Sequence, residues 1–112
     1  MEVTLRKIEY YHAPNGWEPF REWFYSIRDG KTQAAIRERL TRMERGLLGD
    51  CKGLGGGIYE LRIDLGPGYR VYFGQIGRTI LLLLCGGDKS KQSKDIQTAR
   101  SYWEDYWRKK DG

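Results

Sequence analysis

The alternation of apolar and polar residues is clearest over residues 58–91, where it predicts three successive antiparallel strands that run into a cationic loop. In the first strand one face is apolar and the other is polar, as in a half-buried strand. The apolar face holds Tyr59, Leu61, Ile63 and Leu65, and the polar face holds Glu60, Arg62 and Asp64. The pattern therefore predicts a sheet with one packed face and one charged face.

Gly66-Pro67-Gly68 predicts a three-residue turn into the second strand. The register that puts all apolar residues on one face pairs Leu65 with Tyr69, Ile63 with Val71, Leu61 with Phe73, Asp64 with Arg70, and Arg62 with Tyr72. Two guanidinium groups, a phenol and a carboxylate then lie close together on the polar face. The alternative is a wet sheet face that carries ordinary surface charges.

The third strand, residues 79–86, is apolar on both faces because it contains four consecutive leucines. We therefore expect an inner strand that is covered on both sides. It is much shorter than the roughly 20 apolar residues that span a bilayer. Asp88, Lys89, Ser90 and Lys91 follow just before a helix, where backbone amides and lysines favour a phosphate, with a solvated loop as the alternative.

The other elements follow from the same kind of periodicity. Residues 3–11 predict a strand that borders the sheet. Residues 19–28, opened by Pro19, and residues 32–45 predict amphipathic helices, and a last helix opens around Ser93. Residues 46–57 contain six glycines and predict a loop in which Lys52 is mobile. The order predicts one α+β domain over residues 1–112, a small antiparallel sheet with two N-terminal helices and a C-terminal helix on one face and the other face free.

The composition favours a negatively charged partner. Lys plus Arg is 20 and Asp plus Glu is 15, a net charge of +5, which points to nucleic acid or an acidic protein segment more than to a membrane. Cys51 and Cys85 form neither a CxxC pair nor a metal cluster, so we expect reduced thiols and no metal or cofactor. The N-terminal MEVTLRKIEYY is charged where a secretion signal needs an apolar core. We therefore expect a cytoplasmic protein.

Two further groups are candidates for function. His12 is the single histidine; it is a candidate general base, although a histidine at a strand end is more often solvated or hydrogen-bonded. The second predicted helix carries Arg37, Arg39, Arg42 and Arg45. These arginines are candidates for RNA contact, with a solvated helix face interspersed with Glu38 and Glu44 as the alternative.

Three runs of sequence resemble the RelE/ParE superfamily of toxins from toxin–antitoxin pairs, and within it the HigB-like, phage-associated addiction-module killer proteins. The runs are Glu60-Leu61-Arg62, Gly66-Pro67-Gly68-Tyr69-Arg70-Val71-Tyr72-Phe73 and Leu83-Leu84-Cys85-Gly86-Gly87-Asp88-Lys89-Ser90. The resemblance covers nearly the whole chain. It implies a RelE-like fold and, as in the RelE and HigB branches, metal-independent cleavage of mRNA in the ribosomal A site.

The resemblance also implies a partner. Toxins of this kind are silenced by an antitoxin encoded beside them, and HigB-type antitoxins are helix-turn-helix proteins that repress the operon. We therefore expect a HigA-like antitoxin as the partner. We expect the toxin to be associated with operator DNA only through the toxin–antitoxin complex. The ParE branch is similar in shape but poisons DNA gyrase without nuclease chemistry, which keeps a gyrase inhibitor as the alternative. A pure binding or regulatory module is a third possibility.

The residues agree with metal-free RNA cleavage, which needs a base, an acid and cations around the phosphate. We expect the catalytic residues to be Arg62, Arg70, Lys89 and Asp88 and the RNA-binding residues to be Lys52, Tyr72 and Lys91. The arginines would stabilise phosphate charge, and Lys89 and Lys52 would clamp the phosphate or carry a proton. Asp88 would act as base or orient the cations, and Tyr72 would stack on a splayed base or donate a hydrogen bond. Which group is the acid and which the base stays open.

Overall fold

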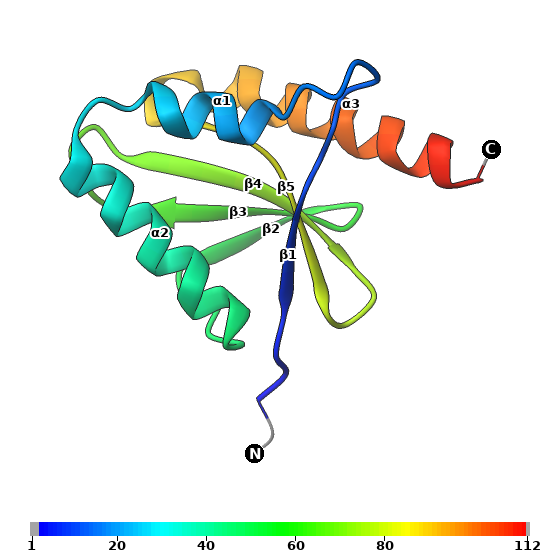
Figure 1. Cartoon of the computed structure of the whole chain (residues 1–112), viewed down its shortest axis with the longest axis horizontal. Coiled ribbons are helices and arrows are strands. Elements are labelled where there is room, and N and C mark those ends of the chain that lie inside the picture. The colour runs from blue at the N-terminus through cyan, green and yellow to red at the C-terminus, as the bar shows by residue number, and fades with distance from the viewer. Residues whose placement is uncertain (1–2, 112) are drawn as a thin grey trace.

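The computed structural model describes residues 3–111 as a five-stranded sheet with helices on both faces (Figure 1). The strands are β1 (Lys7–Tyr10), β2 (Cys51–Gly55), β3 (Ile58–Ile63), β4 (Tyr69–Ile76) and β5 (Ile80–Asp88), in the order β1-β5-β4-β3-β2. The helices are α1 (Pro19–Ser26), α2 (Gly30–Glu44) and α3 (Gln92–Asp111), with a 3-10 turn, η1 (Lys89–Lys91), before α3. The predicted α+β class is confirmed.

The sheet is mixed, so the prediction of an antiparallel sheet is wrong for its first strand. β1 runs parallel to β5, with Lys7 opposite Ile80 and Tyr10 opposite Leu83, while the other pairs are antiparallel. The alternation along residues 3–11 predicts a strand but carries no information on the direction of its partner. β5 lies between β1 and β4, which confirms the prediction of an inner strand.

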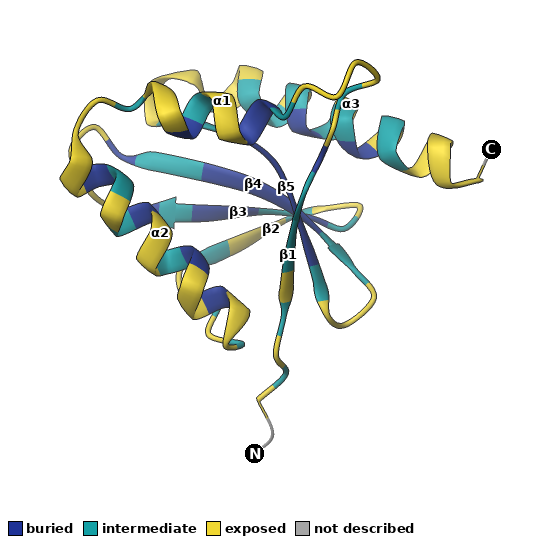
Figure 2. Ribbon diagram, viewed as in Figure 1, coloured by how far each residue is buried: buried dark blue, intermediate teal, exposed yellow. Residues whose placement is uncertain are grey.

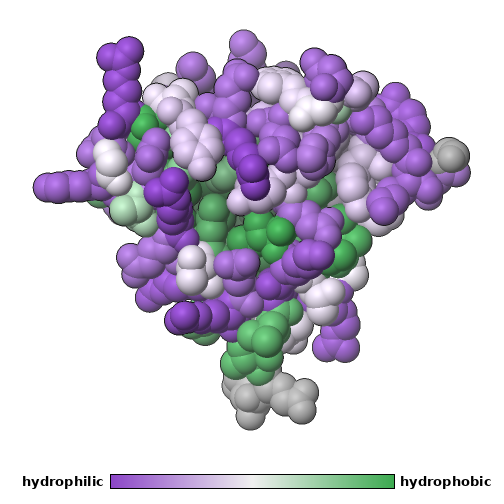
Figure 3. Space-filling view, in the orientation of Figure 1, coloured by the Kyte–Doolittle hydropathy of each residue, from purple (hydrophilic) through white to green (hydrophobic). Residues whose placement is uncertain are grey.

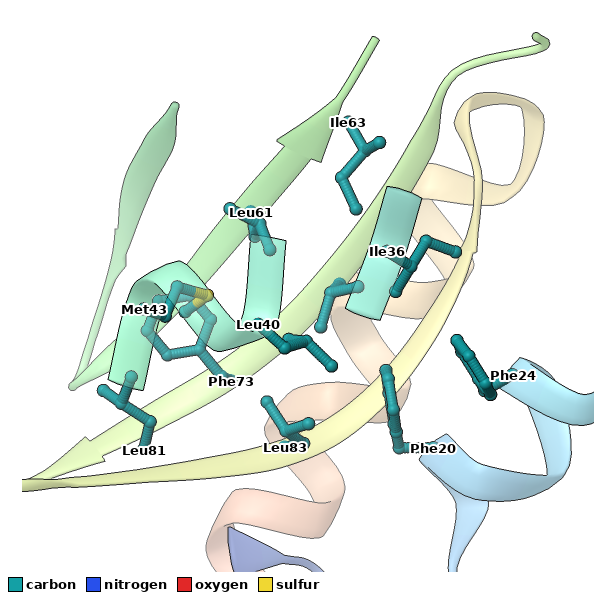
Figure 4. Close-up of a cluster of buried hydrophobic side chains, with 11 residues drawn as sticks. Phe20, Phe24, Ile36, Leu40, Met43, Leu61, Ile63, Phe73, Leu81 and Leu83 are labelled. Carbon is teal, nitrogen blue, oxygen red and sulfur yellow. The ribbon is translucent and has the colours of Figure 1, made fainter. Parts of the chain in front are cut away.

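α1 and α2 cover one face of the sheet, where they form the larger core (Figure 4). Pro19 occupies the first turn of α1, as predicted, and the Asp29 side chain caps α2 by accepting a hydrogen bond from the Lys31 amide. The buried side chains of this core are Phe20, Phe24, Ile36, Leu40, Met43, Leu61, Ile63, Val71, Phe73, Leu81 and Leu83. The inward sides of both helices are buried and their outward sides are exposed (Figure 2). Hydrophobic side chains show between the two helices in the space-filling view (Figure 3).

α3 packs on the opposite face, so the prediction that this face is free is wrong. Trp103 and Ala99 of α3 join Ile58, Tyr72, Leu82, Leu84 and Cys85 in a second core. Gly74 lets the helix approach β4, because a Cβ at that position would lie 2.0 Å from the Trp103 ring. No helix within residues 3–111 is long and apolar enough to cross a bilayer.

The glycine-rich stretch is partly a strand, so the prediction of a loop over residues 46–57 is wrong there. β2 pairs with β3, with Cys51 opposite Leu61 and Lys52 opposite Glu60. Glycines have low strand propensity, but pairing with β3 supplies the backbone hydrogen bonds that stabilise this outer strand. Lys52 therefore lies on a strand and not in a mobile loop.

The β3–β4 register differs by two residues from the predicted one. Ile63 lies opposite Tyr69, Arg62 opposite Arg70, and Glu60 opposite Tyr72. The connection contains five residues, 64–68, because the chain turns back twice, with the Leu65 amide donating to the Ile63 carbonyl at 3.0 Å and the Gly68 amide to the Leu65 carbonyl at 2.9 Å. A shift of two preserves the faces of the strands, so the apolar pattern is satisfied by both registers.

Candidate functional site

A buried carboxylate, Glu60, is the centre of the polar side chains on the α3 face of the sheet. Its side chain is 0% exposed. Oε1 accepts a hydrogen bond from Arg62 Nε at 3.0 Å and lies 3.8 Å from Arg70 Nε. Oε2 accepts from the Tyr72 hydroxyl at 3.1 Å and from Gln92 Nε2 at 2.8 Å. These five residues, which we call the Glu60 cluster, come from β3, β4 and the first residue of α3.

Hydrogen bonds within the Glu60 cluster shift the pKa values of its members. Burial alone would raise the pKa of Glu60, but the hydrogen bonds from Gln92, Arg62 and Tyr72 outweigh burial and lower it. The hydrogen bond to Glu60 raises the pKa of Arg62. Burial, with the adjacent charge of Glu60, raises the pKa of Tyr72. At neutral pH Glu60 is therefore a carboxylate, Arg62 is a guanidinium ion, and Tyr72 is a neutral phenol that donates to the carboxylate.

Arg62 and Arg70 lie side by side on neighbouring strands and keep donors for a ligand. The Arg62 side chain is 35% exposed and the Arg70 side chain 13%. Among the hydrogen bonds within residues 3–111, Arg62 uses Nε alone and Arg70 uses Nη1, which donates to the Tyr69 carbonyl at 3.2 Å. The charges of Glu60, Arg62 and Arg70 add to +1. The pair can therefore bind an anion without losing the carboxylate that holds it.

Two lysines lie beside the Glu60 cluster. Lys89 flanks the same glycine as Arg70: a Cβ on Gly68 would lie 3.6 Å from Lys89 Cβ and 3.7 Å from Arg70 Nη1. The Lys89 amide donates to the Gly68 carbonyl at 2.8 Å, which fixes the start of η1 against the β3–β4 turn. Lys52 is opposite Glu60 in the β2–β3 pairing, and directly opposed residues share a face. The structure thus brings Arg62, Arg70, Lys89 and Lys52 to one end of the sheet.

Asp88 and Lys91 lie at the two ends of η1. Asp88 Oδ1 accepts hydrogen bonds from the Ser90 amide at 2.8 Å and from the Ser90 hydroxyl, and these bonds lower the pKa of Asp88. The Asp88 carboxylate is thus occupied as the cap of η1 and not directed at Arg62 or Arg70. Lys91 is exposed at the end of η1, beside the entrance to α3.

Three features of the site differ from the sequence-based expectation. Tyr72 is 0% exposed beneath the start of α3, so its ring is not presented for stacking on a base. The predicted carboxylate, Asp64, lies exposed in the turn, and Glu60 takes its place. The sequence does not predict Gln92 as part of the site, because nothing in its sequence context indicates a contact with β3. The sequence does indicate the position of Glu60: it precedes Arg62 by two residues, and residues two apart in a strand lie on the same face.

A second carboxylate, Asp95, lies next to the Glu60 cluster. The side chain of Asp95 fills the space above Gly87, where a Cβ would lie 1.9 Å from Oδ2. Oδ2 is buried and has no hydrogen-bond partner within residues 3–111, and burial raises the pKa of Asp95. Because Gly87 is the β5 partner of Arg70, Asp95 lies over the strand next to that arginine.

His12 takes no part in the Glu60 cluster. Its Nε2 lies 3.2 Å from Glu18 Oε2, and its side chain is 60% exposed. Within residues 3–111 no group of three or more His, Cys, Asp or Glu side chains is arranged to hold a metal ion.

The fold and site define a small α+β protein whose sheet carries a pair of arginines on a buried carboxylate. The chain is 44% identical over 81 residues to a protein of Haemophilus influenzae described as "Uncharacterized protein". The match covers 72% of this chain and 82% of that protein. The chain therefore belongs to the same family as this Haemophilus influenzae protein. No family model matches the chain.

Proposed function

We propose that this protein is the toxin of a type II toxin–antitoxin pair, a RelE/HigB-like endoribonuclease that cleaves mRNA on the ribosome without a metal ion and arrests translation. The observation that carries the proposal is the pairing of Arg62 with Arg70, two guanidinium groups held on adjacent strands by the buried Glu60 carboxylate. The resemblance of residues 60–62, 66–73 and 83–90 to these toxins supports the same function.

The Glu60 cluster suits a reaction in which negative charge develops on a phosphate. In metal-free cleavage the 2′-oxygen attacks the neighbouring phosphorus, the bond from phosphorus to the 5′-oxygen breaks, and a cyclic phosphate and a 5′-hydroxyl result. Arg62 and Arg70 are already fixed by the sheet and by Glu60, so little reorganisation is needed when they stabilise the extra charge. Guanidinium forks also match pairs of phosphate oxygens.

We expect the groups around Arg62 and Arg70 to carry out the proton transfers. The attacking 2′-hydroxyl loses a proton and the leaving 5′-oxygen gains one, so the reaction needs a base and an acid but no further reactant. Lys89, beside Arg70, is the best placed to exchange a proton or to clamp the phosphate. In this proposal Lys52 and Lys91 bind RNA, and Asp88 orients η1 and Lys89.

The proposed partners are mRNA on the ribosome and a helix-turn-helix, HigA-like antitoxin encoded beside the toxin. Such an antitoxin would silence the toxin either by covering the Arg62/Arg70 face or by binding elsewhere and blocking entry to the ribosome by bulk. The proposed place of action is the cytoplasm, and the proposed toxin meets operator DNA only in complex with the antitoxin.

The experiment is brief induction of the protein followed by primer-extension mapping of cellular transcripts. We expect growth arrest and new cuts inside translated codons, and no cuts in transcripts that lack a ribosome-binding site. Intact transcripts together with inhibited DNA supercoiling would instead assign a ParE-like gyrase inhibitor. Normal growth would indicate a binding or regulatory module.

A further inference from the structure

A hollow at the C-terminal end of α2 is a second cationic site. It has a volume of about 600 Å³ and lies between the last turns of α2 and the loop that leads to β2. Its charged residues are Arg39, Arg42 and Asp50, which add to +1. A hollow of this size holds more than a single phosphate group. Of the four arginines that the sequence offers as candidates for RNA contact, Arg39 and Arg42 line this hollow.

Arg39 contributes a guanidinium group that is only partly paired. Its Nη1 donates to the Arg62 carbonyl at 3.0 Å. Its Nη2 is buried and has no hydrogen-bond partner within residues 3–111. Gly49, with a φ of +71°, packs closely on this nitrogen, because a Cβ there would lie 2.6 Å from it. A buried N–H group without an acceptor is costly, and a nearby anion would offset that cost.

Arg42 and Leu47 line the open part of the hollow. Arg42 is exposed in the last turn of α2, three residues after Arg39, and it therefore lies on the same side of the helix. Leu47 lies beyond the end of the helix and is 56% exposed. The hollow thus combines an accessible guanidinium, a shielded guanidinium and an apolar side chain, which suits a phosphate together with its sugar.

The hollow and the Glu60 cluster meet at a single residue, Arg62. The Arg62 amide donates to the Asp50 carbonyl at 2.9 Å, and its carbonyl accepts from Arg39 on the hollow side. Its side chain extends to Glu60. The two cationic sites are therefore adjacent and are linked through one residue of β3. A single RNA strand, which carries a phosphate at every nucleotide, matches sites in series better than an isolated carboxylate does.

We propose that the Arg39/Arg42 hollow binds a phosphodiester group of the same single-stranded RNA that contacts Arg62 and Arg70, at a nucleotide flanking the cleaved one. The assignment rests on the proposed function in that it takes RNA as the ligand. Arg42 makes the direct contact, and Arg39 adds charge from beneath Gly49.

The test measures RNA binding separately from cleavage. The probe is a fluorescent single-stranded RNA whose 2′-hydroxyls are methylated, so that it cannot be cut, and binding is followed by anisotropy over a range of salt concentrations. Arg42→Gln should weaken binding about three- to tenfold and make the slope of log affinity against log salt shallower by about 0.7, the value for one single-strand phosphate. Arg78→Gln, which removes the same charge from the exposed β4–β5 turn, is the matched control and should bind like the wild type.

Arg39→Gln provides a second variant, with its folding checked by urea denaturation because it loses the bond to the Arg62 carbonyl. If Arg42→Gln and folded Arg39→Gln keep the affinity and salt slope of the control, the assignment is wrong. It is also wrong if a poly-glutamate peptide binds in an Arg42-dependent manner while RNA does not, since the hollow would then serve an acidic protein segment. Arg42-dependent RNA binding in a protein that produces no transcript cuts would uphold the hollow and overturn the nuclease.

Discussion

Replacing Glu60 by Gln should destabilise the protein although the two side chains have nearly the same shape. The carboxylate is 0% exposed and accepts hydrogen bonds from Tyr72 and Gln92 within the protein. A hydrogen bond to a charged group contributes about 1.5–3 kcal/mol, and the amide oxygen of glutamine can keep only part of this set. We therefore expect the free energy of unfolding to fall by about 2–4 kcal/mol, a large share of the roughly 5–15 kcal/mol typical of a domain.

The effect should depend on pH in a defined direction. Because the pKa of Glu60 is lowered in the folded state, its charge stabilises the fold above the unfolded-state pKa of about 4.3, and this contribution is lost as the pH falls through the lower folded-state pKa. The difference between wild type and Glu60→Gln should be constant from about pH 7 to about pH 5 and should shrink below about pH 4.3.

Urea denaturation followed by circular dichroism, repeated at several pH values, measures this difference. Glu38→Gln is the matched control, because Glu38 is exposed on α2, and it should change stability by less than about 0.5 kcal/mol. A loss below about 1 kcal/mol for Glu60→Gln, or a loss that stays the same down to about pH 3.5, would falsify the reasoning that a buried carboxylate anchors the cluster.

The remaining predictions concern the arginine pair, the packing of α3 and the thiols. Arg70→Ala should slow ribosome-dependent cleavage by about a hundredfold or more, with partial rescue by Arg70→Lys, and unchanged cleavage by folded protein would remove Arg70 from the site. Gly74→Ala should lower the midpoint of urea unfolding by an amount equivalent to about 2–3 kcal/mol, because the added methyl group meets Trp103, and an unchanged midpoint would contradict that close packing. Burial raises the pKa of the buried Cys85 to about 12 and that of the half-buried Cys51 to about 11, so both thiols should react slowly with a disulfide reagent near neutral pH, and fast labelling of both in native protein would contradict this shielding.

The elements that were predictable from the sequence are those whose hydrophobic pattern is compatible with one type of secondary structure. The stripe of Phe20 and Phe24 after Pro19 requires a helix, and the four leucines of residues 81–84 require a strand that is covered on both sides. The parallel direction of β1 and the strand β2 were not predictable, because each depends on a partner distant in sequence or on backbone pairing alone. In the glycine-rich segment no side-chain pattern marks the strand.

The candidate site was predictable as a set of charged residues but not as an arrangement. Arg62 and Arg70 were expected on one face, and they lie there in both registers because a shift of two residues keeps every side chain on its face. Which carboxylate joins them depends on the length of the turn, and five connecting residues replace Asp64 by Glu60. The Gln92 contact depends on how α3 crosses the sheet, which its own periodicity does not determine.

The short strand β1 has a consequence for the solution behaviour of the protein. β5 would be an edge strand without β1, and its run of leucines beside unpaired backbone groups would favour aggregation. β1 covers that edge over four residues, and its end is held where the Tyr11 amide donates to the Leu83 carbonyl at 2.9 Å and the Tyr11 hydroxyl to Asp105 on α3 at 2.5 Å. Damage to this attachment should therefore first show as self-association of an otherwise folded chain.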